Sequence, residues 1–132
     1  MAPTAGAFAA YTSSNVVTAG PNEVVRMAYD RILTSCDRAE SAHEARISVW
    51  LETFHTECVR AEDILVELAG MLATKHEDPA VAELADQLWA LYGFCHAQLV
   101  SANVMKDPEP LGAVRSTIGS LRDAWSEGVC QQ

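Results

Sequence analysis

Two Glu-x-x-His pairs, Glu40 with His43 and Glu52 with His55, are the residues whose types and spacing come nearest to a reactive site. Side chains three residues apart share one helix face, and di-iron bundles use such a pair on each of two helices, with single glutamates from the other two. Here both pairs lie near the expected first turn between helices, and the later apolar stripes carry no inward carboxylate. We favour chance as the origin of the motif, and keep a di-iron-like metal-binding bundle as an alternative.

Other patterns that could support catalysis are missing from the sequence. It has neither a glycine-rich loop for phosphate nor the strand-turn-helix setting of a nucleophilic serine. The cysteines stand singly, three at apparent core positions and one in an expected tail: Cys36, Cys58, Cys95 and Cys130. Such residues read as small apolar groups and a tail thiol rather than as ligands. We therefore expect a protein that is not an enzyme, with reduced thiols and with no metal or cofactor.

Apolar residues recur at alternating steps of three and four, the spacing that stacks side chains on one helix face. The four stripes are Val25, Tyr29, Ile32, Cys36, Ala39 and His43; Ile47, Leu51, Phe54, Cys58, Ala61, Leu65, Leu68 and Leu72; Val81, Leu84, Leu88, Leu91, Cys95, Leu99 and Ala102; and Leu111, Val114, Ile118, Leu121 and Trp125. They predict helices over about 21–41, 45–73, 79–104 and 108–126. Short links make neighbours antiparallel, so the fold class is all-α, an up-down four-helix bundle.

Helix-start signals support these boundaries. Pro21 after Gly20 suits the first helix, and Asp78-Pro79 and Asp107-Pro108 suit the third and fourth, because proline fits a first helical position where its missing N–H costs nothing. The first break, within 41–46, contains neither glycine nor proline. Its position is therefore the least defined of the three.

Length and charge narrow the class of partner. A chain of 132 residues forms one domain, and its 18 acidic against 9 basic residues give a net charge of −9. Nucleic acid and anionic membranes would repel it, so we expect neither nucleic-acid binding nor membrane insertion, but a protein partner. The beginning of the sequence lacks the pattern of a signal peptide, and no apolar run approaches a membrane span. We expect a cytoplasmic protein that is a monomer or a weak homodimer when free.

The first 22 residues contain no charged side chain. We expect residues 1–20 to form a mobile arm, with Phe8, Tyr11, Val16 and Val17 as apolar anchors, and residues 127–132 to form a tail. The third helix has apolar residues beyond its stripe, namely Trp89, Tyr92, Phe94 and Val100. This surplus indicates a surface groove that the arm, or a short helix within it, can cover or a partner helix can fill. A central position for this helix, or a structural dimerisation module, remains an alternative.

Several segments, in this order, resemble the flagellar secretion chaperone family, FliS. At the start they are Thr18-Ala19-Gly20-Pro21 and Met27-Ala28-Tyr29-Asp30. Later segments are Leu88-Trp89-Ala90-Leu91-Tyr92-Gly93-Phe94, Leu99, Ala102-Asn103, Asp107 and Leu121-Arg122-Asp123-Ala124-Trp125. Their order and spacing extend over most of the chain.

This resemblance implies a small helical bundle that binds the disordered C-terminal region of flagellin in the cytosol. Members of the family prevent early polymerisation of flagellin and deliver it to the flagellar export apparatus. The bound segment becomes helical on the outside of the bundle, and an arm tyrosine, here Tyr11, lies over part of that surface when flagellin is absent. The residues expected to bind the partner are Tyr11, Val16, Val17, Trp89, Tyr92, Phe94 and Asn103, with Leu91 as a possible support.

Overall fold

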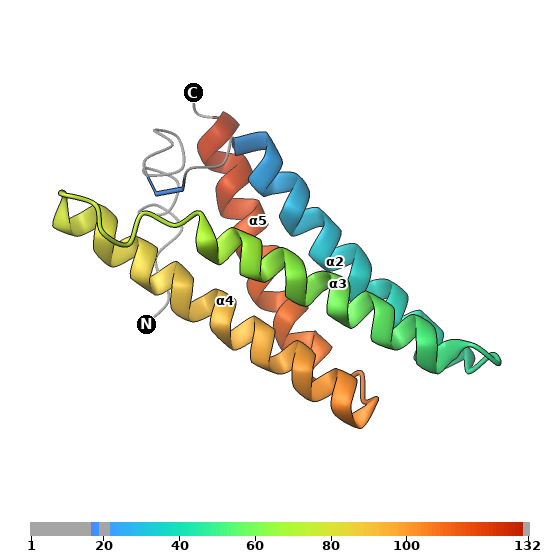
Figure 1. Ribbon diagram of the computed structural model, residues 1–132. Coiled ribbons are helices and arrows are strands. Elements are labelled where there is room, and N and C mark those ends of the chain that lie inside the picture. The colour runs from blue at the N-terminus through green and yellow to red at the C-terminus, as the bar shows by residue number, and fades with distance from the viewer. Residues whose placement is uncertain (1–16, 19–21, 131–132) are drawn as a thin grey trace.

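Four antiparallel helices form a bundle in the computed structural model, which describes residues 17–18 and 22–130, with side chains as far as residue 126 (Figure 1). The helices are α2 (Asn22–Ala45), α3 (Trp50–Gly70), α4 (Pro79–Met105) and α5 (Leu111–Cys130). The prediction of an all-α four-helix bundle is confirmed. Within the described residues, no helix has the length and hydropathy needed to cross a membrane.

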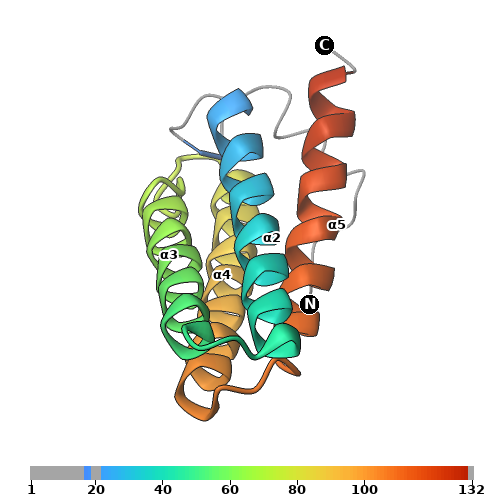
Figure 2. The same cartoon turned by 90° about the vertical axis from the view of Figure 1, so that its right-hand side faces the viewer.

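Each helix packs against two neighbours. Helix α2 lies between α3 and α5, and α4 completes the bundle by packing against the same two helices (Figure 2). The helices α2 and α4 are therefore diagonal to each other. The surface between α3 and α4 forms one long side of the bundle.

The apolar stripes form most of the core, as their spacing predicts. The bulkiest side chains that are fully buried include Trp125, Tyr29 and Phe54. Trp125 meets Tyr29 edge-on, with ring centroids 6.1 Å apart, and its Nε1 donates to the Asn22 carbonyl at 2.9 Å. Burying aromatic rings of this size contributes strongly to stability. These contacts join α5 to the first part of α2.

The first turn lies later than predicted. Helix α2 continues to Ala45, and Arg46 then takes a left-handed conformation with φ of 52°. Because α3 begins only at Trp50, Ile47 belongs to the turn and is 63% exposed, and Leu51 is also exposed. The placement of Ile47 and Leu51 in the core was wrong. The Arg46 guanidinium stacks over the Trp50 ring at 4.8 Å, which holds the two sides of the turn together.

The second turn contains a short pairing with the segment that precedes α2. Helix α3 ends at Gly70 rather than at 73, because Leu72 pairs with Thr18 and the Ala73 amide donates to the Val17 carbonyl at 3.0 Å. The start of α4 follows the prediction. The Asp78 side chain accepts from the Ala80 amide at 2.9 Å, with Pro79 as the first helical residue.

The last helix is displaced toward the end of the chain. Residues 108–110 form a turn, in which the Leu111 amide donates to the Pro108 carbonyl at 3.0 Å, so α5 begins at Leu111 rather than at 108. The same helix continues to Cys130, beyond the predicted end at 126. Residues 127–130 of the expected tail are therefore helical.

Candidate functional site

A mostly apolar hollow of about 410 Å³ lies between α3 and α4. Trp89 stands at its edge with 56% of its surface exposed, and Val66 on the opposite helix is also exposed. The residues that line the hollow are Leu65, Val66, Ala69, Gly70, Trp89, Tyr92, Gly93 and His96. An exposed tryptophan next to an apolar hollow is typical of a surface that binds another apolar group.

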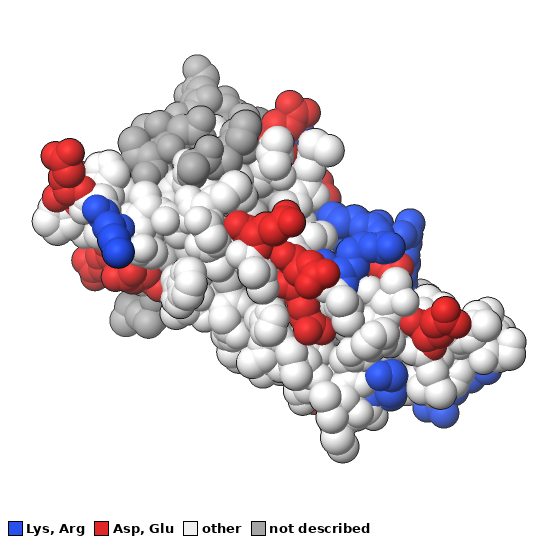
Figure 3. Space-filling model, in the orientation of Figure 1, with Lys and Arg blue, Asp and Glu red and all other residues white. Residues whose placement is uncertain are grey.

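The outer surface of α4 extends this apolar character along the helix. From Gln87 to Met105 the sequence contains no Asp, Glu, Lys or Arg, although α4 lies on the outside of the bundle. Its exposed large apolar residues are Trp89, Phe94, Val100, Val104 and Met105. In Figure 3 the surface along α4 is almost entirely white between its two ends. A soluble bundle has no structural need for so long an uncharged outer face.

Tyr92 differs from the other predicted contact residues because it belongs to the core. Only 3% of its surface is exposed, and its hydroxyl lies 2.6 Å from that of Tyr29. It forms part of the floor of the hollow, and its stripe neighbour Leu91 is only half-buried. The placement of Tyr92 on the surplus surface was therefore wrong, whereas Leu91 is partly buried and packs against the core as its stripe predicts. Burial raises the pKa of the Tyr92 hydroxyl well above its usual value.

Trp89 and Phe94 are both exposed, but they face different directions. They are five positions apart in the sequence, which turns their side chains about 140° apart around α4. Trp89 lines the hollow against α3, whereas Phe94 is 45% exposed and is not among the lining residues. Of this pair, only Trp89 belongs to the hollow.

Polar residues lie further along the boundary between α3 and α4. Asn103 Nδ2 is hydrogen-bonded to His55 Nδ1 at 2.9 Å, and the Lys106 ammonium donates to the Asn103 carbonyl at 2.6 Å. Nearby, burial raises the pKa of the Glu62 carboxyl, and the neighbouring His96 opposes this rise. Asn103 therefore links the end of α4 to α3 through His55.

The predicted contacts from the arm are only partly within the described residues. Tyr11 and Val16 lie outside them. Val17 is fully buried in the core cluster, and its carbonyl accepts from Ala73, as described above. The structure therefore places Val17 as an attachment point of the arm on the bundle.

The two Glu-x-x-His pairs are not brought together as metal ligands. Glu40 accepts a hydrogen bond from Arg115 at 2.9 Å. The His43 ring is hydrogen-bonded to Arg46 at 3.0 Å, and Glu52 is exposed. His55 is bonded to Asn103 on the side facing α4. Among the side chains that the structure describes, at residues 17–18 and 22–126, no three His, Cys, Asp or Glu residues converge as a metal site would require.

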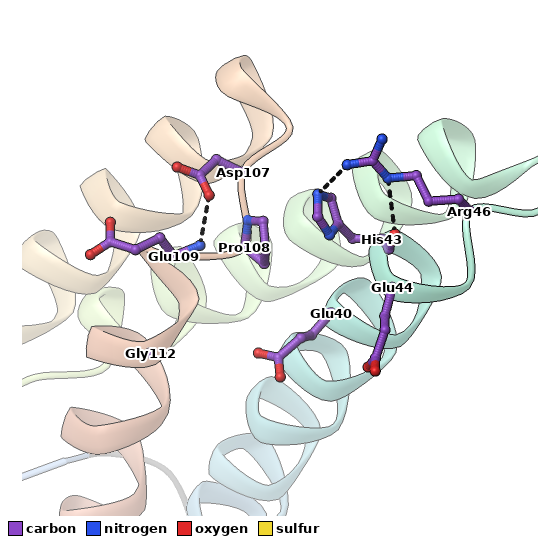
Figure 4. A pocket seen from close by; sticks show the side chains of 8 residues that line it. All are labelled: Glu40, His43, Glu44, Arg46, Asp107, Pro108, Glu109 and Gly112. Atoms are coloured by element: carbon purple, nitrogen blue, oxygen red, sulfur yellow. Dashed lines mark hydrogen bonds between the residues drawn. The ribbon is translucent and has the colours of Figure 1, made fainter.

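A second hollow, of about 600 Å³, lies where the first and last turns meet. Figure 4 shows Glu40 and Glu44 of α2 on one side and Asp107 and Glu109 of the other turn opposite them. The Asp107 carboxylate accepts from the Glu109 amide at 3.0 Å, which shapes the turn. This acidic hollow contains no nucleophile paired with a base, so it does not resemble a catalytic site.

The sequence reasoning missed the residues that α3 contributes to the apolar hollow. Val66 follows the stripe residue Leu65 directly, so a second apolar residue at this point was the only available signal. Gly93, which lines the same hollow from α4, gave a clearer signal, because a glycine inside a helical pattern often marks a position where a side chain is left out. A Cβ atom placed at Gly93 would meet no atom within 4 Å.

Comparisons with known proteins identify the family. Residues 4–132 match the family described as Flagellar protein FliS. A relative from Bacillus subtilis (strain 168), named Flagellar secretion chaperone FliS, is 28% identical over 122 residues, which cover 92% of this chain and 85% of the relative. The match extends over the apolar hollow, the uncharged face of α4 and the core beneath them. The chain therefore belongs to the flagellar protein FliS family.

Proposed function

We propose that this protein is a cytoplasmic flagellar secretion chaperone without catalytic activity. Its client is the disordered C-terminal region of flagellin, which binds as a helix along the apolar hollow and the outer face of α4. Membership of the FliS family and the name of the Bacillus relative support the general role. Binding keeps flagellin from polymerising early and allows its delivery to the flagellar export apparatus.

The observation that carries this proposal is the absence of charge from Gln87 to Met105 on an outer helix. A disordered segment loses entropy when it folds on a partner, so it must bury about 1,000 to 3,000 Å² in return. The hollow beside Trp89 could accept one or two side chains, whereas the full length of α4 offers an area of the required size. A long helical client fits this surface better than a small ligand.

Different residues have different roles in this proposal. Trp89 and Phe94 contact the client directly, and Tyr92 supports the hollow from below. Asn103 holds α3 and α4 together at the far end of the surface. In the free protein, which we expect to be a monomer or a weak dimer, the arm over residues 1–20 covers part of the surface through Tyr11 and Val16, with Val17 as its attachment.

Calorimetry and circular dichroism with a peptide from the C-terminal region of the cognate flagellin test this proposal. We expect binding with a strongly negative heat-capacity change and a gain in total helicity, because apolar area is buried as the peptide folds. A folded sample that gives no heat and no added helicity would contradict the proposal. A constant oligomer that ignores the peptide would instead identify a structural dimerisation module.

A further inference from the structure

Three arginines surround one buried carboxylate where α2 and α3 meet. The Glu57 side chain is only 8% exposed, and its Oε2 lies 3.2 Å from Arg60 and 3.9 Å from Arg38, while its Oε1 lies 3.9 Å from Arg31. Only the Arg60 contact is a hydrogen bond. Glu57 Oε1 is buried without a hydrogen-bond partner among the described residues. We call Arg31, Arg38 and Arg60 the arginine patch.

The arginine patch has more positive charge than the carboxylates around it can balance, unlike Arg115 and Arg122. Arg115 pairs with Asp37 and Glu40, and Arg122 pairs with Asp30 and Asp123. The arginine patch instead shares a single carboxylate among three guanidinium groups. Each guanidinium has five N–H donors, so most of the donors of the patch are available to further acceptors. The arginine side chains are 34 to 54% exposed, so a ligand can reach them.

This local excess of positive charge contrasts with the acidic character of the rest of the chain. Without these three arginines and Glu57, the chain has six basic and 17 acidic residues. Figure 3 shows the largest blue area of that view at the boundary of α2 and α3. A long polyanion such as RNA, or an anionic membrane, would extend from this patch onto acidic surface, where it would be repelled. A short acidic segment avoids that repulsion.

A hollow beside the patch adds a second requirement for the ligand. It has a volume of about 410 Å³, its surface is mainly apolar, and Arg38 is one of the residues that line it. Ile47 and Trp50 contribute apolar surface to it from the first turn. A ligand that follows the patch would therefore place an apolar side chain next to its carboxylates.

We propose that the arginine patch and this hollow dock a short, carboxylate-rich segment of a partner protein that carries an aliphatic side chain between its acidic residues. The carboxylates pair with Arg31 and Arg38, where bidentate hydrogen bonds are available, and the aliphatic side chain enters the hollow. The partner is distinct from the client in the α3–α4 hollow. Glu57 and Val66 are nine residues apart on α3, which places them about 180° around that helix. Both surfaces can therefore be occupied together.

A labelled synthetic peptide that alternates pairs of glutamates with single leucines tests this proposal by fluorescence anisotropy. We expect binding that weakens between about 0.05 M and 0.3 M salt, because exposed ion pairs are screened. Arg31→Gln with Arg38→Gln should weaken binding by about tenfold, as expected for two lost ion pairs. Arg38→Gln alone provides a milder variant, should the double variant unfold. The control, Arg26→Gln with Lys75→Gln, removes the same charge elsewhere and should bind like the wild type.

Additional ligands and one more variant distinguish docking at the arginine patch from general charge attraction and from binding at the α3–α4 hollow. A peptide with glutamine in place of glutamate should bind much less, and Trp89→Ala should leave binding unchanged. The proposal would be overturned by equal loss in the control variant, by equal binding of the glutamine peptide, or by loss of binding in Trp89→Ala. Equal or tighter binding of single-stranded RNA or anionic vesicles, lost in the double variant, would also overturn it. Because Trp89 belongs to the client surface and not to the arginine patch, a failure of the arginine-patch proposal would leave the flagellin proposal unaffected.

Discussion

The hydroxyl groups of Tyr29 and Tyr92 lie 2.6 Å apart in the middle of the bundle. These residues belong to α2 and α4, the two helices that are diagonal to each other, so their hydrogen bond crosses the core. Tyr92 also lies beneath the hollow at the surface. The proposed binding surface is thus fixed directly to the centre of the protein.

The Tyr29–Tyr92 hydrogen bond predicts strong coupling between the two residues. Either Tyr29→Phe or Tyr92→Phe leaves one buried hydroxyl without its partner, which should cost about 1 to 3 kcal/mol in unfolding free energy. The double variant should cost clearly less than the sum of the two, because no unpaired hydroxyl remains. Urea unfolding of all four proteins measures this coupling. Simple additivity would show that the hydroxyl groups do not interact.

The buried thiols predict low reactivity in the folded state. Burial raises the pKa to about 12 for Cys36 and Cys58 and to about 11 for Cys95. In a Cys130→Ser background, these thiols should not react with a disulfide reagent at about pH 8 until the protein unfolds, since the thiolate is the reactive form. Rapid reaction of one of them in native protein would show that its surroundings open to solvent.

The same thiols predict a loss of stability in alkali. The folded protein keeps protons that the unfolded chain begins to release near pH 9, so the stabilising contribution of the thiols is complete below that pH. It is lost as the pH rises through the unfolded value toward the folded values of about 11 and 12. Burial also raises the pKa of the Tyr29 and Tyr92 hydroxyl groups, so their contribution to stability is likewise lost in alkali. The urea midpoint should therefore be unaffected by these groups from pH 7 to 8 and should fall above about pH 9.

The core residues of a helix could be predicted from the sequence where its buried and exposed faces differ clearly in polarity. In α2 the buried residues Val25, Tyr29, Ile32, Cys36 and Ala39 follow the predicted stripe, because most residues on the other faces are polar. Helix α4 is apolar almost all round, so its periodicity could not show that Tyr92 faces inward. A partner far away in the sequence, Tyr29, determines that rotation.

Other features depended on contacts that no local pattern contains. The charge patterning gave no sign that Glu57 would be buried among arginines from two helices. The first turn was misplaced because Arg46, neither glycine nor asparagine, takes the left-handed conformation there. Both features arise from tertiary packing that overrides local preference.

We predict that burial of Val17 attaches the arm to the bundle. Val17→Ala removes two buried methyl groups and should weaken docking of its segment by about 1.5 kcal/mol, since burial of each contributes about 0.8 kcal/mol. We expect greater binding of a hydrophobic dye and faster proteolysis near the arm, while the helices stay folded. The exposed Val24 gives the control variant Val24→Ala. Indistinguishable behaviour of the two variants would mean that Val17 does not retain the arm.

A larger side chain at Gly93 should fill the α3–α4 hollow while the bundle stays folded. A side chain at Gly93 would point into open space, so Gly93→Ala should raise the unfolding free energy by about 0.5 to 1 kcal/mol through helix propensity. Gly93→Leu should fill the hollow and weaken binding of the flagellin peptide by about tenfold or more. Gly112→Leu, at the other hollow, also has open space and serves as the control. Equal peptide affinity in Gly93→Leu and wild type would place the client elsewhere.

The affinity of Trp89→Ala for the C-terminal peptide of the cognate flagellin, compared with that of Met27→Ala, tests the central claim most directly. Both side chains are large, apolar and similarly exposed, at 56% and 59%, but only Trp89 lines the hollow between α3 and α4. Truncation of a central aromatic contact should cost about 2 kcal/mol or more, which corresponds to about thirtyfold weaker binding. We predict this loss for Trp89→Ala and wild-type affinity for Met27→Ala. Full affinity in Trp89→Ala, with the protein folded, would contradict the assignment of this surface to flagellin.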